Sequence, residues 1–199
     1  MNYGKKIGNE ILEWCESFVF AMMIVMLLFI FVFRQVRVNG PSMESTLLDG
    51  DRVIMFHGKY TPHHGDIVIV DSEACADKSA GEKSKIIIKR VIGVEGDTIL
   101  IDYNTNEVFV NDELISNENI KDYDDQDNVD ILMDSPYFDP SYAVDDGVYA
   151  YVVPEGNIFV MGDNRNNSKD SRTIGFVETD TIWGHPVFRV YPFDKIGKI

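Results

Sequence analysis

The sequence is poor in cysteine and in basic residues. Its two cysteines, Cys15 and Cys75, are too few for a disulfide scaffold and lack the clustered Cys/His spacing of a structural zinc site. Only 18 Lys and Arg oppose 33 Asp and Glu, the net charge is -15, and no long basic tract occurs. A surface that binds nucleic acid needs clustered cations. The composition therefore argues against nucleic-acid binding and favours a well-solvated acidic surface.

One long apolar run stands out in this acidic chain. From Phe18 to Phe33 the sequence FVFAMMIVMLLFIFVF carries no charge. It predicts a membrane-spanning helix at 17–35, although the run is slightly shorter than the roughly 20 residues of a full span. A cleaved secretion signal is the alternative, but Arg34 and Arg37 follow the run in place of an A-x-A cleavage site. Basic residues lie on both sides of the run, so charge alone leaves the orientation open.

After the apolar run, short β-branched segments alternate with turn residues. Such segments, bounded by Gly, Pro and Asp, indicate strands, and we predict them at 52–56, 66–71, 85–94, 98–101, 107–110, 149–152, 158–161 and 183–190. No long 3.6-residue period appears beyond residue 34. We therefore predict a mainly β domain over 36–199, preceded by a short N-terminal segment at 1–16 and the anchor at 17–35.

Two polar insertions interrupt the strands, at about 72–84 and about 111–147. The second contains KDYDDQDNVDILMD, but it lacks the turn glycine and the closing Glu that an EF-hand calcium loop requires. Three of the four histidines, His57, His63 and His64, have no carboxylates in register that would complete a metal site. We expect solvated acidic loops and neither a metal ion nor a cofactor.

Three segments carry residues suited to chemistry. Ser42 lies in the Gly/Pro-marked loop GPSMESTL directly after the anchor, and Lys89 interrupts an Ile/Val run that reads as a buried strand. Burial penalises the ammonium form, so such a lysine can lose its proton near neutral pH and act as a base toward a serine hydroxyl. The alternatives are an ordinary turn serine and a lysine that snorkels to the surface. The third segment, MGDNRNNSKDSR at 161–172, is suited to a rigid turn with Arg–carboxylate pairs.

Together these segments resemble the bacterial-type signal peptidase I family, the serine/lysine dyad family S26. The matching stretches are SMESTLLDGD, HGDIVIV, IKRVIGVEGD and MGDNRNNSKDSRTIGF, and the resemblance covers most of residues 10 to 190 apart from the insertions. It implies a signal-peptidase/repressor-protease-like β-domain with one N-terminal transmembrane helix. It also implies a membrane-bound serine endopeptidase that needs no cofactor.

The same resemblance implies a substrate and a location. The substrates would be secretory preproteins with small residues before the cleavage site, from which the enzyme removes N-terminal signal peptides. The protein would cross the cytoplasmic membrane once, with its N-terminus inside and its catalytic domain outside. Membrane lipid and the translocation machinery are the further partners expected.

The resemblance also assigns roles to the matching residues. Ser42 would attack the scissile carbonyl, and its backbone N–H would stabilise the oxyanion. Lys89 would act as general base, and Ser168 would orient the lysine amine. Four further residues would form supporting ion pairs: Arg90 with Asp163, and Asp170 with Arg172.

Three positions depart from the family pattern. Gly40 replaces a hydroxyl residue that helps some relatives bind the oxyanion, so the second oxyanion donor is unassigned; Ser45 replaces a proline, and Asn166 stands where many relatives have Asp. These departures leave open a catalytically silent, membrane-tethered β-domain that binds leader peptides or a secretion partner. A self-cleaving serine/lysine repressor would instead need a DNA-binding segment where this chain has its anchor. Met43 and Leu47 have two interpretations, a surface for substrate or lipid and ordinary core packing.

Overall fold

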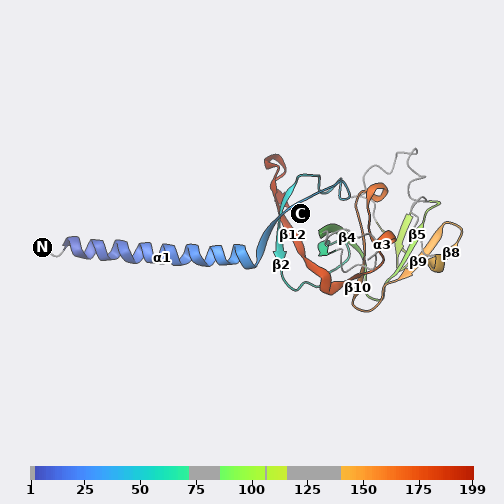
Figure 1. Ribbon diagram of the computed structural model, residues 1–199, viewed down its shortest axis with the longest axis horizontal. Coiled ribbons are helices and arrows are strands. Elements are labelled where there is room, and N and C mark those ends of the chain that lie inside the picture. The colour runs from blue at the N-terminus through green and yellow to red at the C-terminus, as the bar shows by residue number, and fades with distance from the viewer. Residues whose placement is uncertain (1–2, 72–85, 106, 116–139) are drawn as a thin grey trace.

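A computed structural model describes residues 3–71, 86–105, 107–115 and 140–199, which form a long N-terminal helix and a β body (Figure 1). Helix α1 spans Tyr3–Phe31, and its segment Glu10–Phe31 is long and apolar enough to cross a membrane, with a mean hydropathy of 2.3. The most apolar part of this segment is not buried against the rest of the described chain. The helix ends before the predicted anchor does, because the residues from Phe33 onward belong to a strand.

The helix passes into the β body with no linker. Only Val32 separates α1 from strand β1 (Phe33–Arg37). The Val32 N–H donates to the Leu28 carbonyl at 2.8 Å, and the Val32 carbonyl accepts from the His57 N–H at 2.8 Å. The Phe33 ring lies 6.1 Å from Phe29 and 6.0 Å from Phe56 between centroids. Hydrogen bonds and ring contacts thus fix the direction of α1 relative to the sheet.

The strands of the described residues form two antiparallel sheets. The larger has eight strands in the order β1-β2-β12-β3-β4-β10-β11, with β13 paired to β12. Besides β1, these are β2 (Arg52–His57), β3 (Ile67–Asp71), β4 (Ile86–Val94), β10 (Asn157–Met161), β11 (Val177–Glu178), β12 (Ile182–Tyr191) and β13 (Gly197–Lys198). The smaller has five, in the order β7 (Glu113–Leu114), β6 (Glu107–Val110), β5 (Thr98–Asp102), β9 (Val148–Val152) and β8 (Ala143–Asp145). The mainly β prediction is confirmed.

All eight predicted strands are present, and their ends shift by no more than one residue. Strand β1 was missed because it lies in the flank assigned to the anchor, while β7, β8, β11 and β13 are too short to show a period of two. Strands β7 and β8 also fall within the insertion at 111–147, so its two ends extend the smaller sheet and are not loops. The insertion at 72–84 and the centre of the second one lie outside the described residues.

Short helices complete the described body. They are η4 (Pro140–Tyr142), η5 (Arg165–Asn167), α3 (Ser171–Ile174), η6 (Thr179–Thr181) and η7 (Phe193–Lys195). Two of them, η5 and α3, follow β10, and α3 begins within the turn-rich segment 161–172. This segment therefore begins at the end of β10, which lies between β4 and the edge strand β11 of the larger sheet.

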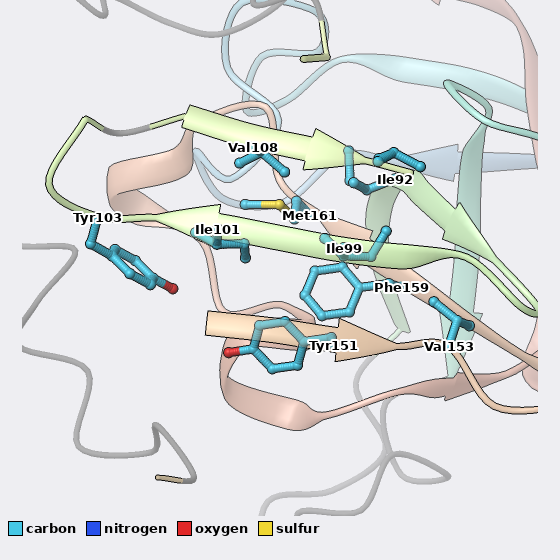
Figure 2. Packing of buried hydrophobic residues seen from close by; sticks show 10 residues of the cluster. Ile92, Ile99, Ile101, Tyr103, Val108, Tyr151, Val153, Phe159 and Met161 are labelled. Atoms are coloured by element: carbon cyan, nitrogen blue, oxygen red, sulfur yellow. The ribbon is translucent and has the colours of Figure 1, made fainter. Parts of the chain in front are cut away.

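A shared core joins the two sheets. Phe159 and Met161 of β10 pack with Ile99 and Ile101 of β5 and with Tyr151 of β9 (Figure 2). Each of these side chains is 5% exposed or less, and burying a side chain of this size contributes about 1.5 to 3 kcal/mol. Because β10 leads directly into the segment 161–172, this core gives that segment a rigid base.

Candidate active site

The loop that carries Ser42 connects β1 to β2. Ser42 itself is half-buried, but Met43 and Leu47 are 1% and 0% exposed and belong to a hydrophobic cluster that includes Val53 and Met55. Core packing is thus the correct interpretation of Met43 and Leu47, which do not line an open surface. Burial of these two side chains holds the loop against the larger sheet.

Lys89 lies in β4, opposite Val68 of β3. Its side chain is 2% exposed, so the snorkelling alternative is wrong. The Lys89 Nζ donates a hydrogen bond to the Ser42 Oγ at 2.7 Å. Side chains alternate along a strand, so Arg90 projects from the other face of the sheet. The fold therefore joins an amine and a hydroxyl that are 47 positions apart in the sequence.

Arg90 and Asp163 form a bidentate ion pair. The Arg90 Nε and Nη2 donate to the two Asp163 carboxylate oxygens, each at 2.7 Å, and Asp163 is 1% exposed. The same carboxylate accepts from the Thr46 Oγ1 at 2.6 Å. Thr46 lies in the Ser42 loop, so this pair connects β4 and the 161–172 segment to the loop that carries the hydroxyl.

Asp170 and Arg172 form a second, more deeply buried pair. The Arg172 Nε and Nη2 donate to the Asp170 carboxylate at 2.8 and 2.9 Å, and the Gly162 N–H donates to it at 3.0 Å. Burial alone would raise the pKa of Asp170, but the charge and hydrogen bonds of Arg172 outweigh burial and hold this pKa below its usual value. Burial would lower the pKa of Arg172, yet the Asp170 charge raises it. Both groups are therefore charged in the folded protein.

Ser168 packs next to the Ser42 backbone. A Cβ added at Gly162 would lie 2.2 Å from the Ser168 Oγ and 2.4 Å from the Ser42 carbonyl oxygen. The Ser168 Oγ is buried and helps to lower the pKa of Asp170, but it has no partner in hydrogen-bond geometry among the described residues. Ser168 thus reaches the site, while its predicted action on Lys89 stays a prediction.

Asn164 contacts the Ser42 loop, although its sequence position did not mark it as a site residue. Its backbone N–H donates to the Ser42 carbonyl at 3.1 Å, and its Nδ2 donates to the Pro41 carbonyl at 3.2 Å. Asn164 thereby anchors the backbone on both sides of the Pro41–Ser42 peptide. Its place beside Asp163 in the polar turn was the one signal available in the sequence.

Arg189 also contacts the Ser42 loop and was not predicted from the sequence. It lies in β12, its Nη2 donates to the Thr46 carbonyl, and its Nε lies 3.3 Å from the Asp51 carboxylate. Asp51 is 3% exposed and also accepts from the Leu48 N–H at 3.1 Å. In the sequence Asp51 is only part of a turn signal, and Arg189 is remote from it. Together they bind the second half of the Ser42 loop to the sheet.

The departures from the family pattern have backbone consequences. Gly40 has φ +91° and donates its N–H to the Asp49 carboxylate at 2.8 Å. Ser45 has φ +95°, a conformation that proline cannot adopt because its ring holds φ near about -65°. Asn166 lies in η5, and its side chain is outside the described part of the structure.

Two of the histidines have partners outside the Ser42–Lys89 pair. His57 Nδ1 lies 2.6 Å from the Trp183 carbonyl, and His64 Nε2 lies 2.6 Å from the Asp97 carboxylate. Within the described ranges, no group of three or more His, Cys, Asp or Glu is placed to hold a metal ion. Cys15 is exposed on α1, and Cys75 falls outside the described ranges.

A serine hydroxyl in contact with a buried amine is the arrangement of a serine peptidase that uses lysine in place of histidine. The family model described as signal peptidase, peptidase S26, matches residues 11–191. The chain therefore belongs to the signal peptidase family S26. This membership confirms the resemblance seen in the motifs.

Individual relatives are similar over nearly the whole chain. Signal peptidase I of Bacillus licheniformis is 32% identical over 200 residues, which cover 96% of this chain and 94% of that protein. Signal peptidase IB of Staphylococcus aureus (strain COL) is 32% identical over 198 residues, covering 94% and 93%. A crystal structure of a signal peptidase I from Enterococcus faecalis V583 aligns with a TM-score of 0.41 at 25% identity, covering 64% of this chain and 98% of that one. The chain is a serine endopeptidase that removes signal peptides.

Proposed function

We propose that Ser42 is the nucleophile and Lys89 the general base of this signal peptidase. The observation that carries the proposal is the 2.7 Å contact between the Ser42 Oγ and a Lys89 Nζ whose side chain is 2% exposed. Burial disfavours an ammonium ion, so it favours the neutral form of the amine over the charged form. The 2.7 Å between the Ser42 Oγ and the Lys89 Nζ is short enough for the hydroxyl proton to pass to the amine.

The proposed reaction has two steps. The Ser42 Oγ attacks the scissile carbonyl carbon while its proton passes to the Lys89 Nζ, and that proton then goes to the amine of the departing mature chain. Lys89 next takes a proton from a water molecule, which attacks the Ser42 ester; the ester bond breaks, the leader peptide leaves with a free carboxyl group, and Lys89 returns the proton to the Ser42 Oγ. The Ser42 backbone N–H stabilises the oxyanion in both steps. Ser168 acts as a positioning residue for the Lys89 amine.

The edge of β4 beside Lys89 suits an extended substrate. Strand β10 pairs with β4 from Arg90 to Val94 but not with Ile86–Ile88, and no other described strand pairs with that edge. An extended leader segment added to this edge gains backbone hydrogen bonds and brings its end to Ser42. Small residues before the cleavage site then fit next to the half-buried hydroxyl.

The proposed setting is the cytoplasmic membrane, which α1 crosses once with the N-terminus inside and the β body outside. The exposed, mainly apolar 22-residue span Glu10–Phe31 of α1 supports the anchor, and secretory preproteins emerging from the translocation machinery are the proposed substrates. Protease treatment of sealed, inverted vesicles tests the orientation. The β body is expected to be shielded there and accessible in right-side-out vesicles, and the opposite pattern refutes the topology.

Cleavage of a precursor with small residues before its cut site tests the dyad. Ser42→Ala and Lys89→Ala are each expected to lower the rate by at least about 100-fold, while the control Lys59→Ala, at an exposed lysine, leaves it unchanged. The wild-type rate should rise from mildly acidic to alkaline pH as the lysine loses its proton. Undiminished cleavage by either variant, or a flat pH profile, contradicts the assignment. A wild-type protein that binds the leader without cutting it would indicate the silent binding domain.

A further inference from the structure

A pocket of about 650 Å³ opens between the two sheets, at the edge of the shared core. One wall is β4, through Arg90 and Ile92, which are two residues apart and so lie on one face of that strand. The other wall is the β6–β7 hairpin, through Val110 and Leu114. Ile92 belongs to the shared core drawn in Figure 2. The pocket has the size of a site for a small organic molecule.

Hydrogen bonds connect the walls of this pocket. Asp97 accepts from the Asn111 Nδ2 at 2.7 Å and lies 2.6 Å from the His64 Nε2, so it joins the hairpin to the loop before β3. The Arg90 Nη1 donates to the Gly65 carbonyl at 2.7 Å and joins β4 to the same loop. Because the walls are held in place before any ligand arrives, binding requires little further ordering of the chain.

Arg165 brings a charged group with no partner among the described residues to the pocket. Its Nε is buried and donates no hydrogen bond. The two carboxylates whose charges act on Arg165 are already bound, Asp163 to Arg90 and Asp170 to Arg172. Burial and the charge of Arg172 lower the pKa of Arg165 to about 10, which leaves the guanidinium charged at neutral pH. A buried donor without a partner indicates a place for a ligand that accepts its hydrogen bond.

The rest of the lining selects among anions. A guanidinium group matches the geometry of a carboxylate or a phosphate. Glu113 also lines the pocket and is exposed on β7, so it repels a ligand that carries a second negative charge. Leu114 and Ile115 add apolar surface beside the charged groups. A carboxylate with a single charge and an aliphatic chain satisfies all three conditions.

The pocket adjoins the support of the Ser42 loop but not the proposed dyad. Arg90 and Asp163 both line it, and both bind the Thr46 hydroxyl of that loop, at 3.1 and 2.6 Å. Neither Ser42 nor Lys89 belongs to the lining. A ligand here therefore contacts residues that hold the loop while leaving the serine and the lysine accessible to substrate.

We propose that this pocket binds an aliphatic carboxylate, with the charged end paired to Arg165 and the chain packed on Leu114 and Ile115. This chemistry has two sources, a free aliphatic acid and the carboxyl terminus of an apolar peptide. The site requires neither the assigned dyad nor any peptidase activity. It is therefore testable in an inactive protein.

Saturation-transfer NMR of hexanoate with the full-length chain in lipid nanodiscs tests the site, with empty nanodiscs as the blank. Hexanoate should bind, whereas its neutral counterpart hexanamide should not, and sulfate, which has no chain, should not displace it. Arg165→Gln should weaken binding at least about tenfold through the loss of a charge-assisted hydrogen bond. Leu114→Ser should weaken it about fivefold, and Val144→Ser, equally exposed on the opposite edge strand β8, is the matched control.

A variant that gains affinity keeps the test decisive if Arg165→Gln fails to fold. Glu113→Gln removes an exposed carboxylate and should strengthen hexanoate binding about threefold. Equal binding of hexanamide, or hexanoate binding that neither Arg165→Gln nor Glu113→Gln changes, overturns the proposal.

Competition with the peptide Leu-Val-Leu distinguishes the two sources. Displacement of hexanoate by the peptide with a free carboxyl terminus, and not by its C-terminal amide, assigns the site to a peptide end. Displacement by neither peptide assigns it to a free acid. Equal displacement by both peptides means that the pocket recognises the chain and not the charge, which contradicts the assigned role of Arg165.

Discussion

Gly162 is where the Ser42 loop, Ser168 and the Asp170 carboxylate meet. Its N–H donates to Asp170, and its missing side chain lets the Ser42 carbonyl and the Ser168 hydroxyl approach. Such close backbone approach requires glycine for reasons of space, not of φ. The glycine of the GDN motif is therefore part of the geometry of the site.

Gly162→Ala is expected to displace the Ser42 loop, because the new methyl would lie 2.4 Å from the Ser42 carbonyl oxygen and 2.5 Å from the Ser168 Cβ. Overpacking of this kind costs about 1 to 3 kcal/mol, and a shift of Ser42, the proposed nucleophile, by about 1 Å lowers the rate roughly 100-fold. Rates and denaturant midpoints measure the two effects. Gly197→Ala is the control, because a Cβ there meets no atom within 4 Å. Full activity of Gly162→Ala would show that the loop tolerates the methyl.

Ser45 holds a backbone conformation that its side chain disfavours. Ser45 has φ +95°, which glycine adopts without strain. Ser45→Gly should therefore raise the free energy of unfolding by about 1 kcal/mol. Ser45→Pro, although it restores the family residue, should lower both stability and cleavage because proline cannot reach this φ. Denaturant unfolding and cleavage assays of both variants measure this. A Ser45→Pro enzyme at least as stable and active as wild type would refute the strained turn.

Among the elements of the site, the segment 161–172 does most to assemble it. Its Asp163 binds Arg90 and Thr46, its Asn164 donates to the Ser42 carbonyl, and its Asp170 accepts from the N–H of Gly162 within the segment itself. Two other parts of the chain, β4 and the Ser42 loop, thus converge on one turn. The turn is itself braced by the buried Asp170–Arg172 pair, so we expect a change there to affect the whole site.

Asp170→Asn leaves the Arg172 charge buried without its partner, which should lower the free energy of unfolding at neutral pH by about 3 to 5 kcal/mol. The pKa of Asp170 is lowered in the folded protein, so its charge stabilises the fold above the ordinary carboxyl pKa. This contribution disappears as the pH falls through the lowered value. The stability gap between wild type and variant should therefore be widest at neutral pH and narrow in acid.

Denaturant titrations of wild type and Asp170→Asn from pH 7 down to pH 3 measure this gap. Asp180→Asn, at an exposed aspartate, serves as the control and should change stability little at any pH. A gap that is independent of pH would mean that the charge of Asp170 contributes nothing to folding.

At the scale of the whole molecule, the tightly bonded junction between α1 and β1 fixes the helix relative to the body that carries Ser42. If α1 is the membrane anchor proposed above, this junction sets the position of Ser42 relative to the bilayer. Inserting Gly-Ser-Gly-Ser between Phe31 and Val32 keeps the Val32–His57 hydrogen bond but frees the helix from the body. Cleavage of a membrane-inserted precursor should fall about tenfold, because the site loses its fixed orientation. Cleavage of a soluble peptide in detergent should not change.

The same insertion between Asp145 and Asp146, in an exposed turn, is the control and should affect neither substrate. If the junction variant cleaves the inserted precursor as fast as wild type, the direction of α1 is irrelevant to catalysis.

Much of the fold could be predicted because local patterns dominate it. The apolar run, the β-branched strands and the glycine-marked turns each depend on a few neighbouring residues. The ends of the eight predicted strands agree with the structure to within one residue. The motifs also pointed to Ser42 and Lys89. Asn164, Arg189 and Thr46 could not be found in this way, because their importance comes from partners far away in the sequence.

The sequence by itself determined an apolar helix, a β body and the chemical groups available to it, since hydrophobic period and turn chemistry act over short distances. The tertiary structure alone decided that Lys89 is buried against Ser42 rather than extended to solvent. It also decided that Met43 and Leu47 belong to the core. Burial depends on which strands become neighbours, and that is a property of the whole sheet.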